Sequence, residues 1–450
     1  MKRQVKIIVV GGNAAGPAAA AKAKRFNPFA EVLLFEASEF ISTGTCEMPY
    51  VLSGEIKDIE NIIHFSPESF LSVKGVKVFV KHFVKEINTK QKKIAALNLI
   101  EDKIIEEKYD QLILATGSKA KSLPGFDTQV KNIFNLKNIN DLKRIDDFLK
   151  DNNVKKGIII GSGFVGLEAA ESLVKRNVRV KVIESESRAL PSSDKEFSEE
   201  ILNVLKRNKV EFLGSIKEAE PLLIGNKLIA VKIDKQILET DFVLVCVGFE
   251  PENYLARSAK LELGQSGAIK VDQYLKTSER FIYGAGDNIE TRCGVTGQPN
   301  YFPLATNSYD LGHIAGENAA GGNIKYDPVV KNISVKIFDK YFVQVGLTSK
   351  EAIQNKIEFN HNFARARNIV EVMPESDYVF GKILVEKNSK RIIGGAFFGG
   401  KEISGYADLL AALIKLKTPA PMLSKINYNY TPPLSPFLNL LKLIGNKLNH

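Results

Sequence analysis

Two short segments constrain this chain more than any other feature, because each is an apolar, strand-like run that ends directly in glycines. The first is VKIIVVGGNAAG (residues 5–16) and the second is KKGIIIGSGFVG (residues 155–166), and an Ala-rich helical stretch follows each. Glycine lets the backbone turn tightly and approach a pyrophosphate, whose charge the amides at the start of the next helix can receive. The internal repeat therefore predicts two dinucleotide-binding units of the strand–helix–strand type.

An acidic residue stands at the expected offset after each glycine turn. Glu36 ends the run AEVLLFE, 25 positions after Gly11, and Glu184 ends the run VRVKVIE, 23 positions after Gly161. Both spacings are close to the roughly 20 residues at which a carboxylate reaches a ribose hydroxyl in this fold. A lone glycine turn is often only a tight turn, but two turns with both acids in place favour dinucleotide binding.

The two turns differ in one position. The second carries the full G-x-G-x-x-G pattern, whereas the first has Asn13 where the middle glycine is expected. The glycines concerned are Gly11, Gly12 and Gly16 in the first turn and Gly161, Gly163 and Gly166 in the second.

Three later segments indicate how the chain is divided into domains. YDQLILATGS (109–118) and DFVLVCVGFEPEN (241–253) are both strands that enter small-residue turns, and we interpret them as crossings between domains. TSERFIYGAGDN (277–288) is another strand, and Asp287 at its end could bind a sugar-like hydroxyl or could be an ordinary capping residue.

Composition narrows the class of protein. At about 150 residues per domain, 450 residues suggest roughly three domains. The net charge of +10 favours anionic partners, but without Trp or an Arg-rich arm we expect phosphate-bearing small molecules and no nucleic acid. Three cysteines make no disulfide framework and propose no metal site, and the first apolar run is too short for a signal peptide or a spanning helix. We therefore expect a cytoplasmic protein.

With these segments in view, the whole chain resembles the FAD-dependent pyridine nucleotide-disulfide oxidoreductases. The resemblance implies an α/β fold with two Rossmann-like three-layer nucleotide-binding domains, one for FAD and one for NAD, and a C-terminal α+β dimerisation domain. It implies a discontinuous FAD domain over 1–120 and 252–326, an NAD domain over 121–251 and an interface domain over 327–450.

The resemblance also assigns roles to individual residues. For FAD they are Gly11, Gly12, Ala15, Gly16, Glu36, Ala115, Thr116, Gly117, Asp287, Pro303, Leu304 and Ala305, the last two through backbone amides at a helix start that would face the flavin. For the nicotinamide cofactor they are Gly161, Gly163, Phe164, Val165, Gly166, Glu168, Glu184 and Gly248. Glu184 would repel a 2'-phosphate and so favours NADH over NADPH, although Lys181 and Arg188 lie close in sequence.

The reaction depends on a single cysteine. The segment ISTGTCEMPYVLSG has only Cys46, and CEMPY resembles the NCGLPY motif of the coenzyme A-disulfide reductases, with Thr45 and Glu47 as departures. Cys46 could instead be only a small buried residue, but the backbone amides of the nearby turn could stabilise its thiolate. The related peroxidases and oxidases carry a histidine that would align with Ala14, so its absence points away from peroxide chemistry.

Further residues are implied for the substrate. NYNYTPPLSP (427–436) resembles a stretch whose tyrosine reaches across a homodimer to the partner's cysteine, a role that would fall on Tyr430; a packed polyproline-type turn is the alternative. The family's second tyrosine has no match. Lys22 and Arg25, on one face of the helix after the first turn, could meet the phosphates of coenzyme A, or could form a solvated face; Thr45 is the third substrate candidate.

These residues predict that NAD(P)H reduces FAD, and that the reduced flavin passes electrons to Cys46, which attacks a coenzyme A disulfide, another small disulfide or a persulfide. Oxygen or polysulfide as acceptor remains an alternative, as does a flavin- and NADH-binding sensor without turnover. The leucines of PFLNLLKLIGNKLNH (436–450) recur at helical spacing beside lysines. We expect a dimer-interface helix there in preference to a membrane-attached one.

Overall fold

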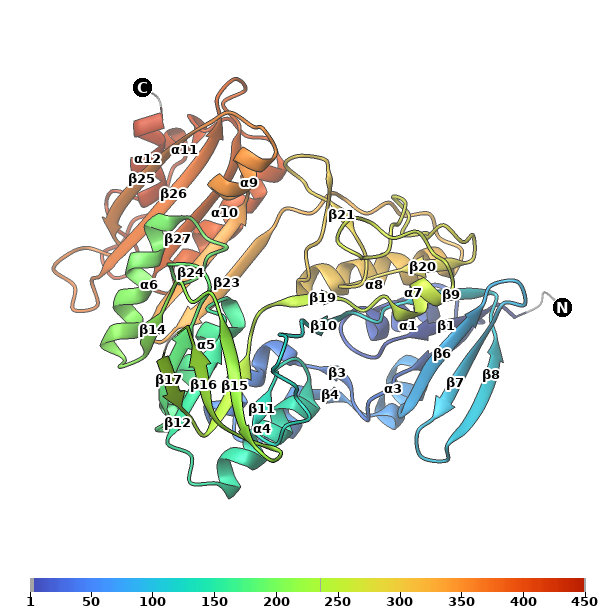
Figure 1. The fold of residues 1–450 in the computed structure, drawn as a ribbon. Coiled ribbons are helices and arrows are strands. Elements are labelled where there is room, and N and C mark those ends of the chain that lie inside the picture. Colours follow the sequence, from blue (N-terminus) through green and yellow to red (C-terminus); the bar gives the residue numbers. More distant parts are fainter. Residues whose placement is uncertain (1–3, 235, 449–450) are drawn as a thin grey trace.

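The computed structural model describes residues 4–234 and 236–448, and its helices and strands are organised around three large sheets (Figure 1). Two of these sheets are parallel and five-stranded, and each comes with a separate three-stranded antiparallel sheet. The third large sheet is antiparallel. The chain is thus a mixed α/β protein with two parallel-sheet nucleotide-binding units, as its repeat predicts.

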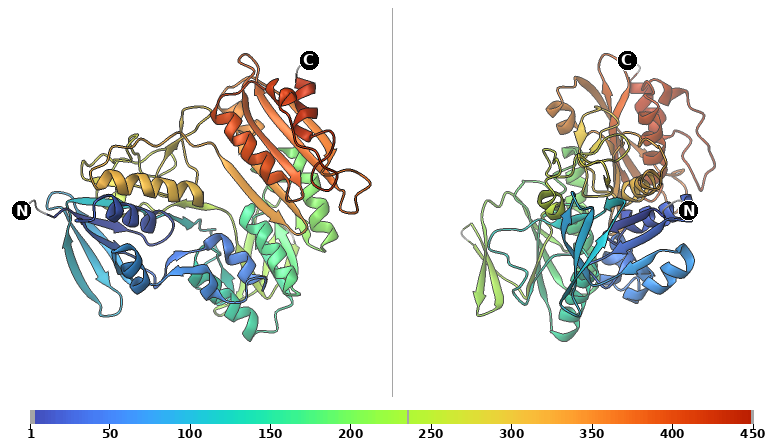
Figure 2. Two further views of the ribbon diagram at one scale, coloured as in Figure 1. Left: turned by 180° about the vertical axis from the view of Figure 1, so that it is seen from behind. Right: turned by 90° about the vertical axis from the view of Figure 1, so that its right-hand side faces the viewer.

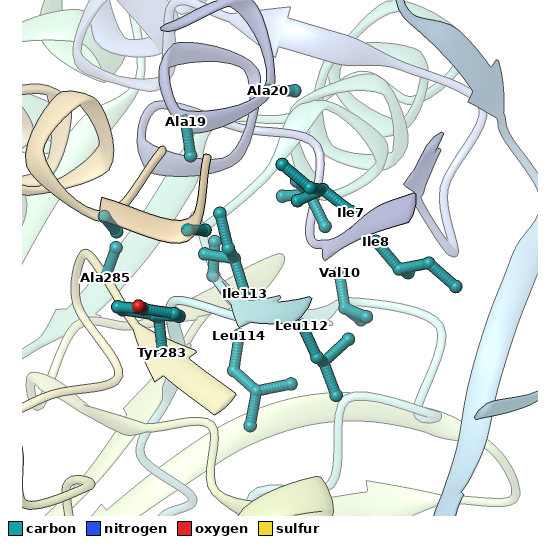
Figure 3. Packing of buried hydrophobic residues seen from close by; sticks show 14 of the residues in the cluster. Ile7, Ile8, Val10, Ala19, Ala20, Leu112, Ile113, Leu114, Tyr283 and Ala285 are labelled. Carbon is teal, nitrogen blue, oxygen red and sulfur yellow. The ribbon is translucent and has the colours of Figure 1, made fainter. Parts of the chain in front are cut away.

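The first parallel sheet has the strand order β20-β9-β1-β2-β5, and its Val- and Ile-rich central strands are buried on both faces (Figure 3). Helices α1 and α8 lie side by side against it (Figure 1). They approach closely because Gly312 and Gly316 face the backbone of Ala15 and Ala19, where an added Cβ would stand 2.3 and 2.2 Å from the carbonyl oxygens.

The elements of the first unit are β1 (Lys6–Val10), α1 (Ala15–Phe26), β2 (Glu31–Phe35), α3 (Pro67–Lys74), β5 (Lys77–Phe79), β6 (His82–Asn88), β7 (Lys93–Asn98), β8 (Lys103–Lys108), β9 (Gln111–Leu114), α7 (Tyr254–Ser258), β20 (Ile282–Gly284) and α8 (Ala305–Ala319). Shorter elements around them are β3 (Ile41–Thr43), η1 (Thr45–Glu47), α2 (Met48–Leu52), η2 (Ile59–Ile62), β4 (Ile63–Phe65), β21 (Thr291–Arg292) and β22 (Pro299–Asn300).

The second parallel sheet repeats this design with the order β11-β18-β12-β13-β14. Its elements are β11 (Ile133–Phe134), α4 (Ile139–Asp151), β12 (Lys156–Ile160), α5 (Phe164–Lys175), β13 (Arg179–Ile183), α6 (Lys195–Arg207), β14 (Glu211–Leu213), β15 (Ala219–Ile224), β16 (Lys227–Ile233), β17 (Gln236–Glu239) and β18 (Phe242–Val245). The antiparallel meanders β6–β8 and β15–β17 were not foreseen from the sequence.

The two segments expected to cross between units lie next to each other. Strand β10 (Ser118–Ala120) leaves the first unit and pairs antiparallel with β19 (Phe249–Pro251), by which the chain returns. The chain therefore passes in and out of the second unit through one two-stranded ladder.

The third sheet has the order β23-β24-β27-β26-β25. Its elements are β23 (Asn332–Ile337), β24 (Lys340–Gly346), α9 (Ser349–Gln354), β25 (Phe359–Arg367), β26 (Tyr378–Glu386), β27 (Ile392–Gly399), α10 (Ile403–Lys415), α11 (Met422–Lys425) and α12 (Leu440–Leu448). Helices cover one of its faces (Figure 2), and the other face packs on the second unit, where Phe197 meets Phe342 at 5.4 Å between ring centres.

The apolar face of the C-terminal helix packs inside its own chain, and an interface role for the rest of the 436–450 segment stays a prediction. The apolar residues Leu440, Leu441 and Ile444 of α12 are fully buried against α11, β25 and β26 of the same chain. Their leucine spacing reflects intramolecular packing, so this face is available neither to a second copy nor to a membrane. Within the described residues, no helix combines the length and the apolar character that a bilayer crossing would need.

Candidate active site

The first glycine turn joins the end of β1 to the start of α1, beside the end of β2. Gly11 has φ +110°, and a Cβ there would stand 2.1 Å from the carbonyl oxygen of Ala115; a Cβ on Gly16 would stand 1.7 Å from the carbonyl oxygen of Gly11. Only glycine fits either position. The amide of Gly12 donates to Glu36 over 2.6 Å, so the acid predicted 25 positions downstream does lie at the turn.

Asn13 explains the missing middle glycine. Its side-chain oxygen accepts hydrogen bonds from the amide and the hydroxyl of Thr43, both at 3.2 Å. Thr43 ends β3, two residues before the turn that carries Cys46. The Asn13 side chain therefore connects the first glycine turn to the cysteine segment, a contact that a glycine at this position could not make.

The second turn has the same construction. Gly161 has φ +103° and lies under the carbonyl of Cys246, while Gly163 has open space where its Cβ would be. Glu184 accepts from the amide and the hydroxyl of Ser162 at 2.9 and 2.8 Å. Burial raises the pKa of Glu184, but these hydrogen bonds prevail and hold it below its ordinary value, so the carboxylate stays charged. The partly exposed Phe164 and Val165 begin α5, and Gly248 has φ +104° beyond β18.

Asp287 is held at the junction of the first sheet and α8. It accepts from Ser118 at 3.0 Å and from Ser308 at 2.6 Å. The neighbouring Thr116 hydroxyl donates to the Glu252 carbonyl, and Gly117 has φ +72°.

One buried polar atom beside this site has no hydrogen-bond partner among the described residues, the Asn307 side-chain nitrogen, and the buried Tyr301 hydroxyl has only Ser118 near it. Buried polar groups are normally paired, so this region has hydrogen-bonding capacity for a polar ligand. At the first glycine turn, Gly11 and Gly16 leave no room for a side chain. This turn and the polar region beside it fit a dinucleotide that lies along the carboxyl ends of β1 and β2.

The start of α8 departs from one detail of the sequence prediction. The helix begins at Ala305, as expected, but the Leu304 amide already donates to the Phe302 carbonyl at 2.9 Å. Two amides were predicted to meet a ligand, and that of Leu304 is engaged within the chain. Pro303 is partly exposed and Ala305 is exposed.

Cys46 lies on the single turn η1 and is exposed, whereas Met48 and Pro49 behind it are buried. The crowding of its surroundings raises the pKa of the Cys46 thiol, Glu47 and Glu168 raise it further, and Lys137 opposes them. This differs from the amide-stabilised thiolate that we expected from the turn residues.

The other two thiols lie elsewhere. Burial raises the pKa of the Cys246 thiol to about 12, and Cys293 is buried in a small cluster with Leu347 and Ile393. All three cysteines are free, so Cys46 has no neighbouring cysteine with which to form a redox disulfide.

The cysteine segment is fastened to the second unit by contacts that sequence reasoning missed. The Ser172 hydroxyl on α5 donates to the Pro49 carbonyl at 2.7 Å, and the Lys175 ammonium pairs with Glu55 at 2.6 Å and Glu171 at 2.7 Å. Lys336 of the third sheet also pairs with Glu171. No local motif signals these contacts, because each joins distant segments.

Glu168 also lies on α5, one turn before Ser172. Burial, with a smaller contribution from the Glu171 charge, raises the pKa of Glu168 to about 8. At neutral pH it is therefore mainly a neutral acid that can donate a hydrogen bond or a proton.

Of the four residues predicted to serve the substrate, only Thr45 is shown beside Cys46 within one chain. Tyr430 is 50% exposed and packs edge-on against Phe437, and no interaction among the described residues joins it to Cys46. Lys22 is paired with Glu317 at 2.6 Å, and Arg25 is exposed near the end of α1. Thr45 directly precedes Cys46 and is partly exposed.

Comparisons with known proteins agree with this arrangement. The family model "Pyridine nucleotide-disulphide oxidoreductase" matches residues 5–318. A "NAD(P)H sulfur oxidoreductase (CoA-dependent)" of Pyrococcus abyssi is 28% identical over 100% of this chain and 99% of its own length, and a "Coenzyme A disulfide reductase" of Staphylococcus aureus is 27% identical over 98% and 99%. The solved structure of a NAD-dependent persulfide reductase from A. fulgidus has a TM-score of 0.94 at 28% identity, covering 98% of this chain and 82% of that one.

Proposed function

Because this chain belongs to the pyridine nucleotide-disulphide oxidoreductase family, we propose that it is a flavoenzyme that uses NADH to reduce coenzyme A disulfide or a related low-molecular-weight disulfide or persulfide through Cys46. One observation carries the proposal: an exposed, solitary thiol lies where the first unit meets α5, the helix that starts at the second glycine turn. A polysulfide is the nearest alternative acceptor, in line with the name of a relative from Pyrococcus horikoshii, "NAD(P)H coenzyme A polysulfide/persulfide reductase", which is 26% identical over 98% of this chain.

The residues that would hold FAD are those of the first turn, with Glu36 at the ribose and Asp287 along the sugar-like chain. NADH would lie on the second turn against Glu184. When bound, FAD supplies two-electron transfer between a nicotinamide and sulfur.

The chain's own residues account for the sulfur chemistry. The Cys46 thiolate attacks one sulfur of a disulfide RSSR, which forms the mixed disulfide Cys46–S–S–R and releases RS⁻. Restoring the thiolate consumes two electrons and releases the second thiol, so the net reaction is NADH + H⁺ + RSSR → NAD⁺ + 2 RSH. Glu168, neutral near pH 7, is placed on α5 to donate a proton to a departing thiolate.

The charged side chains near the second glycine turn support a preference for NADH. Glu184 remains ionised and would repel a 2'-phosphate. The two nearby cations are occupied, since Lys181 pairs with Glu211 and Arg188 donates to the Pro191 carbonyl. We expect kcat/KM for NADH to exceed that for NADPH by at least about tenfold, which steady-state assays with both cofactors would measure.

We also propose the domain division given by the resemblance: an FAD domain over 1–120 and 252–326, an NAD domain over 121–251 and an interface domain over 327–450. The β10–β19 ladder supports the two boundaries between the first and second units.

A homodimer would bring Tyr430 to the partner's cysteine. Exposed apolar residues gathered near it support this: Leu434 is 64%, Phe437 77% and Leu438 52% exposed. Three free thiols support a reducing, cytoplasmic location.

The test is NADH oxidation by the purified flavoprotein with coenzyme A disulfide, polysulfide and oxygen as separate acceptors. Cys46→Ser should abolish disulfide and polysulfide reduction and leave slow oxidation by oxygen. Cys293→Ala, which removes a buried thiol in a separate cluster, is the matched control and should keep activity. Disulfide reduction that survives in Cys46→Ser would refute the proposal.

Intact mass of the untreated protein distinguishes the acceptors. A Cys46 adduct with the mass of coenzyme A would identify the coenzyme A disulfide reaction, and added sulfur atoms would identify the persulfide reaction.

A further inference from the structure

The turn between β11 and α4 brings a lysine to the same junction as Cys46. Lys137 belongs to the second unit, yet its ammonium lies 4.4 Å from the centre of the Phe249 ring on β19, the strand by which the chain returns to the first unit. No motif pointed to Lys137.

The cysteine turn packs against the segment that carries this lysine. Met48, two positions after Cys46, is buried in one apolar cluster with Leu136 and Leu142, which lie on either side of Lys137 in the sequence. The contact between α2 and α4 is therefore part of a core and not a loose surface approach.

A second pair of contacts holds α4 against the segment just before β3, which leads to the cysteine. The Lys143 ammonium lies 3.6 Å from Glu39 and 4.4 Å from the centre of the Phe40 ring. Lys137 and Lys143 thus follow each other along one boundary between the two units, but only Lys143 has a carboxylate within 4 Å among the described residues.

The charges around Cys46 are mostly of one sign. Glu47 on its own turn and Asp287 after β20 disfavour a thiolate, Glu168 on α5 adds to them only where it is ionised, and Lys137 is the opposing cation. Burial lowers the pKa of Lys137, while Asp287, Cys46 and Asp141 raise it. A partly buried ammonium without its own carboxylate partner is costly unless another anion compensates it.

We propose that Lys137 is a positioning residue of the reaction, whose ammonium stabilises the Cys46 thiolate against the nearby carboxylates of Glu47 and Asp287. The inference rests on the proposed function in taking Cys46 as the nucleophile. The step concerned is ionisation alone: the thiol gives its proton to solvent, and the thiolate is left beside the lysine. Because the cation comes from the second unit, the nucleophile is activated only where the two units are docked.

The experiment measures the ionisation of Cys46 directly. The flavoprotein is reduced with excess dithiothreitol, freed of reductant under argon and alkylated with iodoacetamide between pH 5 and 10, and the Cys46 peptide is quantified by mass spectrometry. In Lys137→Met the midpoint of the alkylation profile should rise by about one pH unit, so that alkylation well below the midpoint becomes about tenfold slower. Lys137→Arg should restore the profile.

Lys143→Met is the matched control, because it removes a lysine from the same boundary and should leave the midpoint unchanged. Melting temperature and flavin content identify a variant that fails to fold, and Lys137→Gln then decides the question in its place. A midpoint that moves by less than about 0.3 unit in a folded variant overturns the inference, since a neighbouring cation shifts a pKa by more than that. Alkylation needs no disulfide turnover, so this result is independent of whether Cys46→Ser loses activity.

Discussion

Replacing Lys382 by Met should strongly destabilise the protein. Lys382 lies on β26, and its side chain is only 3% exposed. Its ammonium is 3.0 Å from Asp194, 2.8 Å from Glu196 and 3.1 Å from the Ser349 hydroxyl. The cluster joins the start of α6 in the second unit to the third sheet, and the one ammonium pairs there with the buried Asp194, 6% exposed, and the partly buried Glu196, 27% exposed.

The magnitude follows from these distances. With an effective dielectric constant of about 20, each ion pair contributes roughly 5–6 kcal/mol of Coulomb energy, most of which the desolvation of three charges offsets in the intact cluster. Removing only the lysine retains the cost of burying the carboxylates and loses the attraction. Breaking a buried pair in this way typically costs about 3–5 kcal/mol, which is the loss of unfolding free energy that we expect.

Urea denaturation at pH 7 measures this loss, with Lys387→Met as the matched control. Lys387 follows the same strand and pairs with Glu358 at 3.2 Å, but both side chains are more than half exposed, so its loss should cost less than about 1 kcal/mol. Burial raises the pKa of Glu196, but its hydrogen bond from Lys382 outweighs this and holds it below the ordinary 4.5. The stability from Glu196 is therefore present above pH 4.5 and lost as pH falls through the lower folded-state pKa, and the deficit of Lys382→Met should shrink there.

Equal losses in the two variants would refute the reasoning, because buried and exposed pairs would then contribute alike. Asp194→Asn provides a further check. Combined with Lys382→Met in a double-mutant cycle, it should give a coupling energy of at least about 1 kcal/mol, since the second substitution removes a charge that the first has left unpaired.

Three further outcomes are expected. Gly16→Ala should lose flavin, seen as a fall in the 450 nm to 280 nm absorbance ratio, because its Cβ would stand 1.7 Å from the Gly11 carbonyl oxygen; full flavin content would contradict the assigned turn. Glu168 has a folded-state pKa of about 8 against an ordinary 4.5, so its stability contribution falls as pH rises between these values. Glu168→Gln should therefore gain thermal stability relative to the wild type from pH 5 to pH 8.5, and a constant difference would exclude the raised pKa. Phe437→Glu should turn a dimer into a monomer in sedimentation, because it charges an exposed apolar patch with Leu434; an unchanged mass would remove this patch from the interface.

Much of the fold could be predicted because its signals are local. A buried strand, a glycine turn and a small-residue helix are contiguous, and the geometry of Gly11 and Gly161 follows from backbone sterics alone. The acids Glu36 and Glu184 lie at their turns because adjacent parallel strands end at one edge of a sheet. The leucine spacing of α12 was also a local signal, but it marked only which face is buried and not what covers it.

The amino-acid sequence by itself thus determined the two nucleotide-binding units and the solitary cysteine. Only the tertiary structure decided what surrounds that cysteine, since Asn13, Lys137 and Ser172 reach its segment from three separate elements. Backbone conformation is encoded in neighbouring residues, whereas the charge and packing around a side chain depend on segments that meet only when the units dock.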